Sequence, residues 1–117
     1  MPVASRYLLC VSMDVDPEVE DLFNEVYDTE HIPSLMQVDG VHSVTRVKGE
    51  SFAFAMAGEV CEIDAPVPRY VAMYEVDDPS VVSSDAWATA VEQGRWAEQV
   101  RPATSNRSHA MYRVLGS

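Results

Sequence analysis

Tyr7-Leu8-Leu9-Cys10-Val11-Ser12-Met13 is a run of mostly large apolar side chains without helical spacing, and it predicts a buried strand. The run ends at Asp14-Val15-Asp16-Pro17, where Asp16 is suited to cap a helix and Pro17 to occupy its first position. Apolar residues then recur at helical spacing, at Val19, Leu22, Phe23 and Val26. We expect this helix to end near His31, because Pro33 disfavours its continuation.

The segments after this helix predict two strands, a second helix and a last strand. The strands are expected at Val41–Lys48, Tyr70–Val76 and His109–Leu115, and the helix is expected from Pro79 or Ser80 to about Val91. The buried side of that helix is expected to consist of Ala86, Trp87, Ala90 and Val91, and a further turn is expected over residues 95–100. Residues 49–68 are compatible with either a short extra strand or an apolar flap at Phe52–Met56.

Strand, helix, strand, strand, helix, strand is the order of the ferredoxin-like βαββαβ arrangement. It predicts an α+β fold with a four-stranded antiparallel sheet and both helices on one face. The chain has 117 residues and a mass of 13.0 kDa, so we expect a single domain over residues 1–117. Apolar residues occupy odd and even positions of Tyr7–Met13, so both faces of the sheet are expected to be buried. This pattern indicates a homodimer formed through the open sheet face.

The charge balance excludes two classes of partner. Eight Lys and Arg residues stand against 19 Asp and Glu residues, a formal charge of −11, which disfavours both nucleic acid and an anionic membrane. No apolar run approaches the roughly 18–20 residues needed to span a bilayer, and we expect no signal peptide at Met1–Arg6. Cys10 and Cys61 are too few for a disulfide scaffold or a zinc cluster. We therefore expect a small acidic cytoplasmic domain with reduced thiols.

The stretch Tyr27-Asp28-Thr29-Glu30-His31-Ile32-Pro33, followed by Val38-Asp39-Gly40-Val41, resembles the dimeric α/β-barrel superfamily, in particular its EthD-like small proteins. In those families a Glu-His-Ile/Val-Pro signature ends the first helix, and a Gly-Val turn leads into the second strand. Arg69-Tyr70-Val71-Ala72-Met73-Tyr74-Glu75 matches their third strand, and the resemblance covers about Ser5 to Leu115. It implies two ferredoxin-like subunits packed sheet to sheet, with a pocket between each sheet and its helices.

The superfamily includes cofactor-free monooxygenases, polyketide cyclases, lactone isomerases, haem-degrading oxygenases and members without known activity. The Asn, Trp and His constellation of the haem-degrading members is not found at the expected strand positions. We therefore expect no haem and no other cofactor. The segment over residues 49–68 is longer than the connection common in the superfamily, so the shape of the pocket does not transfer directly.

His31 is the leading candidate for catalysis. It lies four residues after Tyr27 on the same helix face, and an imidazole exchanges a proton near neutral pH, as a cofactor-free isomerase or cyclase requires. Capping of the helix C-terminus explains the same placement without catalysis. Glu30 could orient His31 or a ligand. The favoured interpretation is a solvated acidic face, because residues 14–30 contain eight acids and no Lys or Arg.

The candidate substrate-binding residues are mostly aromatic: Tyr27, Arg46, Tyr70, Tyr74, Trp87 and Trp96. Tyr70 and Tyr74 are four residues apart on one strand and face the same side, where two phenols suit an aromatic or polyketide-like ligand. Packing in a core or an interface explains the tyrosines equally well and is the default for the tryptophans. Arg46 would hold a carboxylate or phenolate if it points to the helix side, and an ion pair with a nearby acid is its alternative.

No metal site is expected, because no His-x-x-x-His, His-x-His or Cys-x-x-Cys spacing occurs. Gly-rich phosphate loops and a nucleophile elbow are also missing from the sequence. The sequence favours a cofactor-independent enzyme acting by proton transfer on a small oxygenated aromatic, lactone or polyketide-like compound. Isomerisation, cyclisation, decarboxylation and cofactor-free oxygenation all remain open. The alternative is a non-catalytic small-molecule-binding accessory protein of a catabolic pathway.

Overall fold

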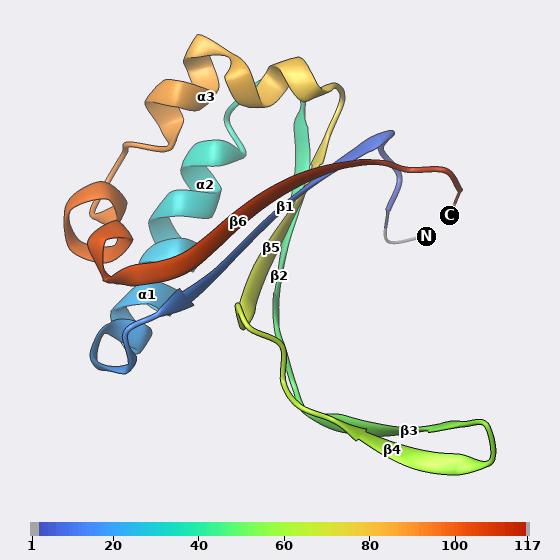
Figure 1. Cartoon of the computed structure of the whole chain (residues 1–117). Helices are drawn as coiled ribbons and strands as arrows, with labels where there is room; N and C mark the ends of the chain where they lie inside the picture. Colours follow the sequence, from blue (N-terminus) through green and yellow to red (C-terminus); the bar gives the residue numbers. More distant parts are fainter. Residues whose placement is uncertain (1–2, 117) are drawn as a thin grey trace.

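The sheet and helices follow the order expected from the sequence. The computed structural model of the chain describes residues 3–116 (Figure 1). Its elements are β1 (Tyr7–Val15), α1 (Glu20–Val26), α2 (Ile32–Leu35), β2 (Val41–Lys48), β3 (Phe52–Met56), β4 (Glu59–Ile63), β5 (Tyr70–Val76), α3 (Asp85–Ala90) and β6 (Thr104–Arg113). The main sheet has the strand order β2-β5-β1-β6, with antiparallel pairing throughout. This is the predicted ferredoxin-like arrangement, and the α+β prediction is confirmed.

The hydrophobic core lies between one face of the sheet and the helices, which Figure 1 shows on the same side of the strands. Side chains alternate along a strand, so the odd positions of β1 and the even positions of β5 point to the same side. That face is buried: Leu9, Val11, Met13, Ala72, Tyr74 and Val76. Phe23, Val26, Leu35, Trp96 and Val100 cover it from the helical layer. Within residues 3–116, no helix is long and apolar enough to cross a membrane.

The first helical segment continues past Pro33, contrary to the sequence prediction. Asp16 caps a 3-10 turn at Pro17–Val19 by accepting a hydrogen bond from the backbone N–H of Glu18 at 3.0 Å. After α1 the chain makes a wide π turn over Tyr27–His31 and then enters α2. Pro33 falls within the first turn of α2, where its missing N–H leaves no required hydrogen bond unmade. The π turn thus allows helix to continue through a residue that normally ends it.

Other details also differ from those expected. α3 begins at Asp85 rather than at Pro79 or Ser80, because a separate 3-10 turn occupies Pro79–Ser83. β6 begins at Thr104, five residues before the predicted start, and ends at Arg113. Its first half, Thr-Ser-Asn-Arg-Ser, has no apolar alternation because it lies in an edge strand and is largely exposed. β1 also extends two residues further, to Val15. Ala86 is exposed rather than buried, because it lines a shallow surface groove between α2 and α3.

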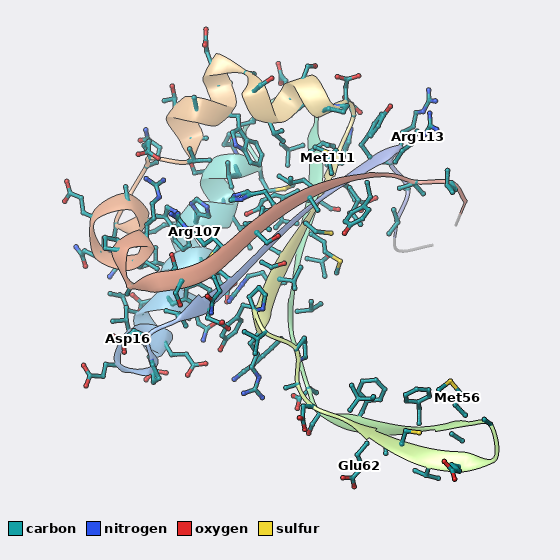
Figure 2. The ribbon with its side chains drawn as sticks, in the orientation of Figure 1. Asp16, Met56, Glu62, Arg107, Met111 and Arg113 are labelled. Atoms are coloured by element: carbon teal, nitrogen blue, oxygen red, sulfur yellow. The ribbon has the colours of Figure 1, made fainter. Side chains whose placement is uncertain are left out.

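Residues 49–68 contain a second, two-stranded sheet, formed by β3 and β4. Phe52 pairs with Ile63 and Phe54 with Cys61, so one face of this hairpin is apolar. Its large side chains are exposed, with Phe52 at 56% and Met56 at 58%. In Figure 1 the hairpin extends away from the sheet on the side opposite the helices. Figure 2 shows Met56 on the upper side of the hairpin, toward the main sheet, and Glu62 on its lower side.

The second face of the main sheet carries no helix. Leu8, Cys10, Val71 and Met73 alternate with the core residues of β1 and β5 and lie on this open face, where they remain partly exposed. Glu75, also on the open face, is buried under the N-terminal segment, and its carboxylate accepts the backbone N–H groups of Ala4 and Ser5 at 2.6 and 3.1 Å. Both cysteines are free.

Candidate functional site

A cavity of about 560 Å³ lies between the helix-side face of the sheet and the helical layer. Leu9, Val11 and Met13 of β1 form its apolar floor. Leu35, Val82 and Val91 of the helical layer add further apolar surface. The remaining lining consists of aromatic and titratable side chains from distant parts of the chain: Tyr27, His31, Tyr74, Trp87, Glu92, Trp96, Arg101, Arg107 and His109. An apolar cavity with a few polar groups converging on it is the usual form of a small-molecule site.

His31 lies on the π turn and points into this cavity. Its ring is 5% exposed and stacks on Trp96, with the ring centroids 4.3 Å apart and an interplanar angle of 20°. The edge of the Tyr27 ring contacts it from the same helical segment, at 5.1 Å between centroids. Among the described residues, Nδ1 of His31 is the one buried side-chain nitrogen or oxygen without a hydrogen-bond partner. A buried polar atom of this kind normally has a partner, so Nδ1 is an unmet hydrogen-bonding atom in the wall of the cavity.

The surroundings of His31 hold its imidazole in the neutral form. Burial, the largest cause, and the nearby positive charge of Arg101 together lower its pKa from the usual 6.5 to about 4, while Glu92 opposes the shift. At neutral pH the ring is therefore uncharged, and one of its nitrogens is a proton acceptor. This differs from helix capping, in which a protonated histidine interacts with the last carbonyl groups.

The lowered pKa of His31 predicts a specific loss of stability in acid. The unfolded chain binds a proton at this residue below pH 6.5 and the folded chain only near pH 4, so folding stability falls as the pH drops through this window. The pKa shift corresponds to a loss of about 3 kcal/mol in the free energy of unfolding, and the loss reaches its full size below pH 4. Urea unfolding of the wild type and of His31→Gln at pH 7, 5 and 4 measures it as the difference between the two chains. A difference that does not change with pH would show that His31 titrates normally.

Two tyrosines form a buried pair beside the histidine. The hydroxyl groups of Tyr27 and Tyr74 are 2.9 Å apart, and either oxygen can donate to the other. The edge of the Trp87 ring packs against Tyr74, with centroids 5.5 Å apart. Burial raises the pKa of both phenols, so both carry their protons at neutral pH. Because one hydrogen bond uses one proton, the second O–H of the pair remains free to donate to a ligand.

Glu30 fixes the position of the histidine rather than belonging to a purely solvated face. Its carboxylate accepts the backbone N–H of Arg95 at 2.9 Å and the Nε–H of the same residue at 2.7 Å. These bonds tie the π turn that carries His31 to the turn that carries Trp96, and they lower the pKa of Glu30. The contact is close: at Gly94, with φ +70°, an added Cβ would lie 2.5 Å from Oε1 of Glu30.

The structure brings together five of the seven candidate residues: Tyr27, His31, Tyr74, Trp87 and Trp96 all line the cavity. Arg46 and Tyr70 do not. Arg46 lies on the helix side but donates to Asp28 at 2.7 Å and Asn24 at 2.6 Å, over the ring of Tyr27. The hydroxyl of Tyr70 donates to Glu20 at the far end of the core. Arg46 therefore forms an ion pair with an acid, which was the alternative to ligand binding, and neither Arg46 nor Tyr70 lines the cavity.

Sequence reasoning missed four polar residues of the cavity: Glu92, Arg101, Arg107 and His109. Arg107 and His109 occupy alternate positions of β6, on the face that carries Met111, so the correct start of that strand would have indicated them. Arg101 and Glu92 form an ion pair with each other. They follow irregular turns, and no sequence pattern placed them near His31. Within residues 3–116, no three His, Cys, Asp or Glu side chains are grouped as a metal site.

Comparison with known proteins gives structural neighbours but no close relative. No family model matches the sequence, and no curated protein matches it significantly. A variant of MhuD with two manganese protoporphyrin IX molecules bound per active site superposes with a TM-score of 0.62 and 11% identity, over 95% of this chain and 96% of that chain.

Two further solved structures are similar over nearly their whole length. An ethyl tert-butyl ether (EthD) family protein from Bacillus halodurans has a TM-score of 0.57 and 12% identity, over 93% of this chain and 99% of that chain. A proposed antibiotic biosynthesis monooxygenase from Bacillus cereus has a TM-score of 0.54 and 15% identity, over 97% and 95%. At these identities the likeness concerns the fold.

Proposed function

Because the chain has the ferredoxin-like fold of the dimeric α/β-barrel superfamily, we propose that its cavity is the active site of a cofactor-independent enzyme. Its substrate is a small oxygenated aromatic, lactone or polyketide-like compound, and the reaction is a proton transfer. The observation that carries this proposal is the neutral, buried imidazole of His31 in the lining of the cavity, where Nδ1 has no hydrogen-bond partner among the described residues.

The proposed step is the removal of a proton from a carbon atom next to a carbonyl group. The C–H bond breaks, the neutral imidazole of His31 takes the proton, and the electron pair moves to the carbonyl oxygen to give an enolate. Return of the same proton to a different carbon completes an isomerisation, in which nothing is oxidised or reduced. Burial and Arg101 disfavour the imidazolium, so His31 gives the proton back readily.

The tyrosine pair supplies the group that stabilises the enolate. Tyr27 and Tyr74 stay protonated because their pKa values are raised, and the O–H left free by their mutual hydrogen bond can donate to the enolate oxygen. A fixed donor in a site shielded from water stabilises developing negative charge more strongly than water does. Trp87 and Trp96 add flat apolar walls that suit a ring compound.

Two variants of the proposal remain: a cofactor-free oxygenation, and binding without catalysis. One neighbour is described as an antibiotic biosynthesis monooxygenase, and removal of a proton from carbon is also the first step of an oxygenation in which dioxygen is the oxidant. Another belongs to the EthD family. The alternative proposal is a non-catalytic small-molecule-binding accessory protein of a catabolic pathway. The same cavity serves all three, and turnover separates them.

Exchange of hydrogen for deuterium tests the proton transfer without knowledge of the natural substrate. We expect the chain, dissolved in D2O with a panel of aromatic ketones and lactones, to remove the proton signals of carbons next to the carbonyl of at least one member. Proton NMR follows the loss, and buffer alone and heat-denatured protein serve as controls. Panel members that shift the melting temperature without exchange would favour the accessory protein. A panel in which no member binds and no member exchanges its protons would contradict the proposed site.

We also propose that the chain is a cytoplasmic homodimer formed through the open sheet face. Leu8, Cys10, Val71 and Met73 lie near the middle of that face and remain partly exposed in the single chain. Two such faces packed about 10 Å apart would remove them from water, as in other sheet-on-sheet structures. Most of the acidic run over residues 14–30 lies on the helical side, away from this contact.

The shape of the chain supports the same assembly. Its accessible surface is 7302 Å², whereas a compact chain of 13.0 kDa exposes about 6,300 Å². Its radius of gyration is 15.8 Å, against roughly 13–14 Å for a compact domain of this length. The excess of about 1,000 Å² is close to what each partner contributes to a stable interface. The β3–β4 hairpin projects on the open side, so a second sheet stacked there would lie against its apolar face.

A further inference from the structure

The cavity has the opposite charge balance to the rest of the chain. Acids outnumber Lys and Arg by 19 to 8 in the whole sequence. The cavity lining, however, holds two arginines, two histidines and a single acid, Glu92, whose charge is already paired with Arg101. A positively charged cavity in an acidic chain attracts negatively charged small molecules.

Of the two arginines that line the cavity, Arg107 is the one without a counterion in the described part of the chain. Within residues 3–116 it forms no ion pair and no side-chain hydrogen bond, whereas Arg46, Arg95 and Arg101 each hold a carboxylate. It lies on β6 where that strand borders the cavity, and Figure 2 labels it on the helix side of the strand. A guanidinium group with all its donors free is suited to bidentate binding of a carboxylate.

His109 extends the same polar edge. It lies two residues after Arg107 on β6, lines the cavity, and faces Val11 of β1 in the sheet register. It has no side-chain partner among residues 3–116, in contrast to His42, which pairs with Asp77 far from the cavity. One edge of the cavity therefore offers free donors, while the tyrosine pair and His31 line its interior.

We propose that the ligand of this cavity is an organic acid, a ring compound whose carboxylate is bound by Arg107 with His109 beside it. This inference rests on the proposed function, since it names the substrate class of the same site. The ring lies among Trp87, Trp96 and the tyrosine pair, and the carboxylate stays at the edge formed by β6.

Two probes of matched shape, 2-naphthoate and 2-naphthylmethanol, test the inference. We expect the wild type to bind the acid about tenfold or more tightly than the alcohol, as measured by quenching of tryptophan fluorescence and by calorimetry. In Arg107→Gln we expect affinity for the acid to fall about tenfold and affinity for the alcohol to stay unchanged. The matched control is Arg113→Gln, which removes the same charge from the same strand at an exposed position outside the cavity and should leave both affinities unchanged.

The outcomes separate this inference from the function on which it rests. Equal affinity for the two probes, or an equal loss of affinity for the acid in Arg107→Gln and Arg113→Gln, would overturn the carboxylate site. Either result would leave the aromatic cavity as a binding site. Binding of neither probe would overturn the carboxylate site and count against the proposed active site as well.

Discussion

Replacement of His31 with glutamine is expected to slow turnover of an accepted substrate by about 100- to 10,000-fold, the usual contribution of a general acid–base group. Glutamine retains a neutral polar side chain but cannot accept a proton near neutral pH. Its effect should therefore fall on kcat more than on KM, because the aromatic walls and the tyrosine pair remain. Deuterium exchange and steady-state rates measure it.

His42→Gln is the matched control for this variant. His42 is exposed, pairs with Asp77 and lies away from the cavity, so the same substitution there should leave the rate unchanged. A melting curve at pH 7 verifies that His31→Gln is folded, since His31 packs against Trp96 and Tyr27. Full turnover in a folded His31→Gln chain would show that the acid–base role is wrong.

Replacement of Met73 with glutamate is expected to convert a dimer into a monomer. Met73 lies opposite Cys10 of β1 and Thr45 of β2, near the middle of the open face. Dimerisation would then bury two uncompensated carboxylates, at a cost of several kcal/mol, so the dissociation constant should rise by more than about 100-fold. In the monomer the new side chain has access to water, and the fold is retained.

Sedimentation at micromolar concentration measures this change. The wild type should sediment at twice the 13.0 kDa of one chain, Met73→Glu at 13.0 kDa, and the control Thr89→Glu, on the exposed side of α3, like the wild type. A monomeric wild type would refute the interface. A variant that still dimerises would place the contact elsewhere, and the apolar face of the β3–β4 hairpin is then the next surface to substitute.

The candidate site was partly accessible from the sequence because two of its groups are local neighbours. Tyr27 and His31 lie four residues apart in one helical segment, and any helical reading brings them together. Trp96 was chosen only as a large aromatic residue. Its stacking on His31 depends on the turn that Glu30 anchors through Arg95, a contact between segments far apart in the chain. The same reason kept Arg101 out of the predicted site, whereas Arg107 was missed because the predicted start of β6 was five residues too late.

The sequence alone determined the bounds of two strands of the main sheet and the order in which the strands and helices of the ferredoxin-like arrangement follow one another. Val41–Lys48 and Tyr70–Val76 were predicted to the residue, because each is a run of strand-forming side chains bounded by turn residues, and such signals are local. Only the tertiary structure decided how the chain continues past Pro33, where β6 begins and what residues 49–68 form. A π turn, an exposed edge strand and a projecting hairpin are set by packing and by contacts with distant segments, which leave no regular hydrophobic period in the sequence.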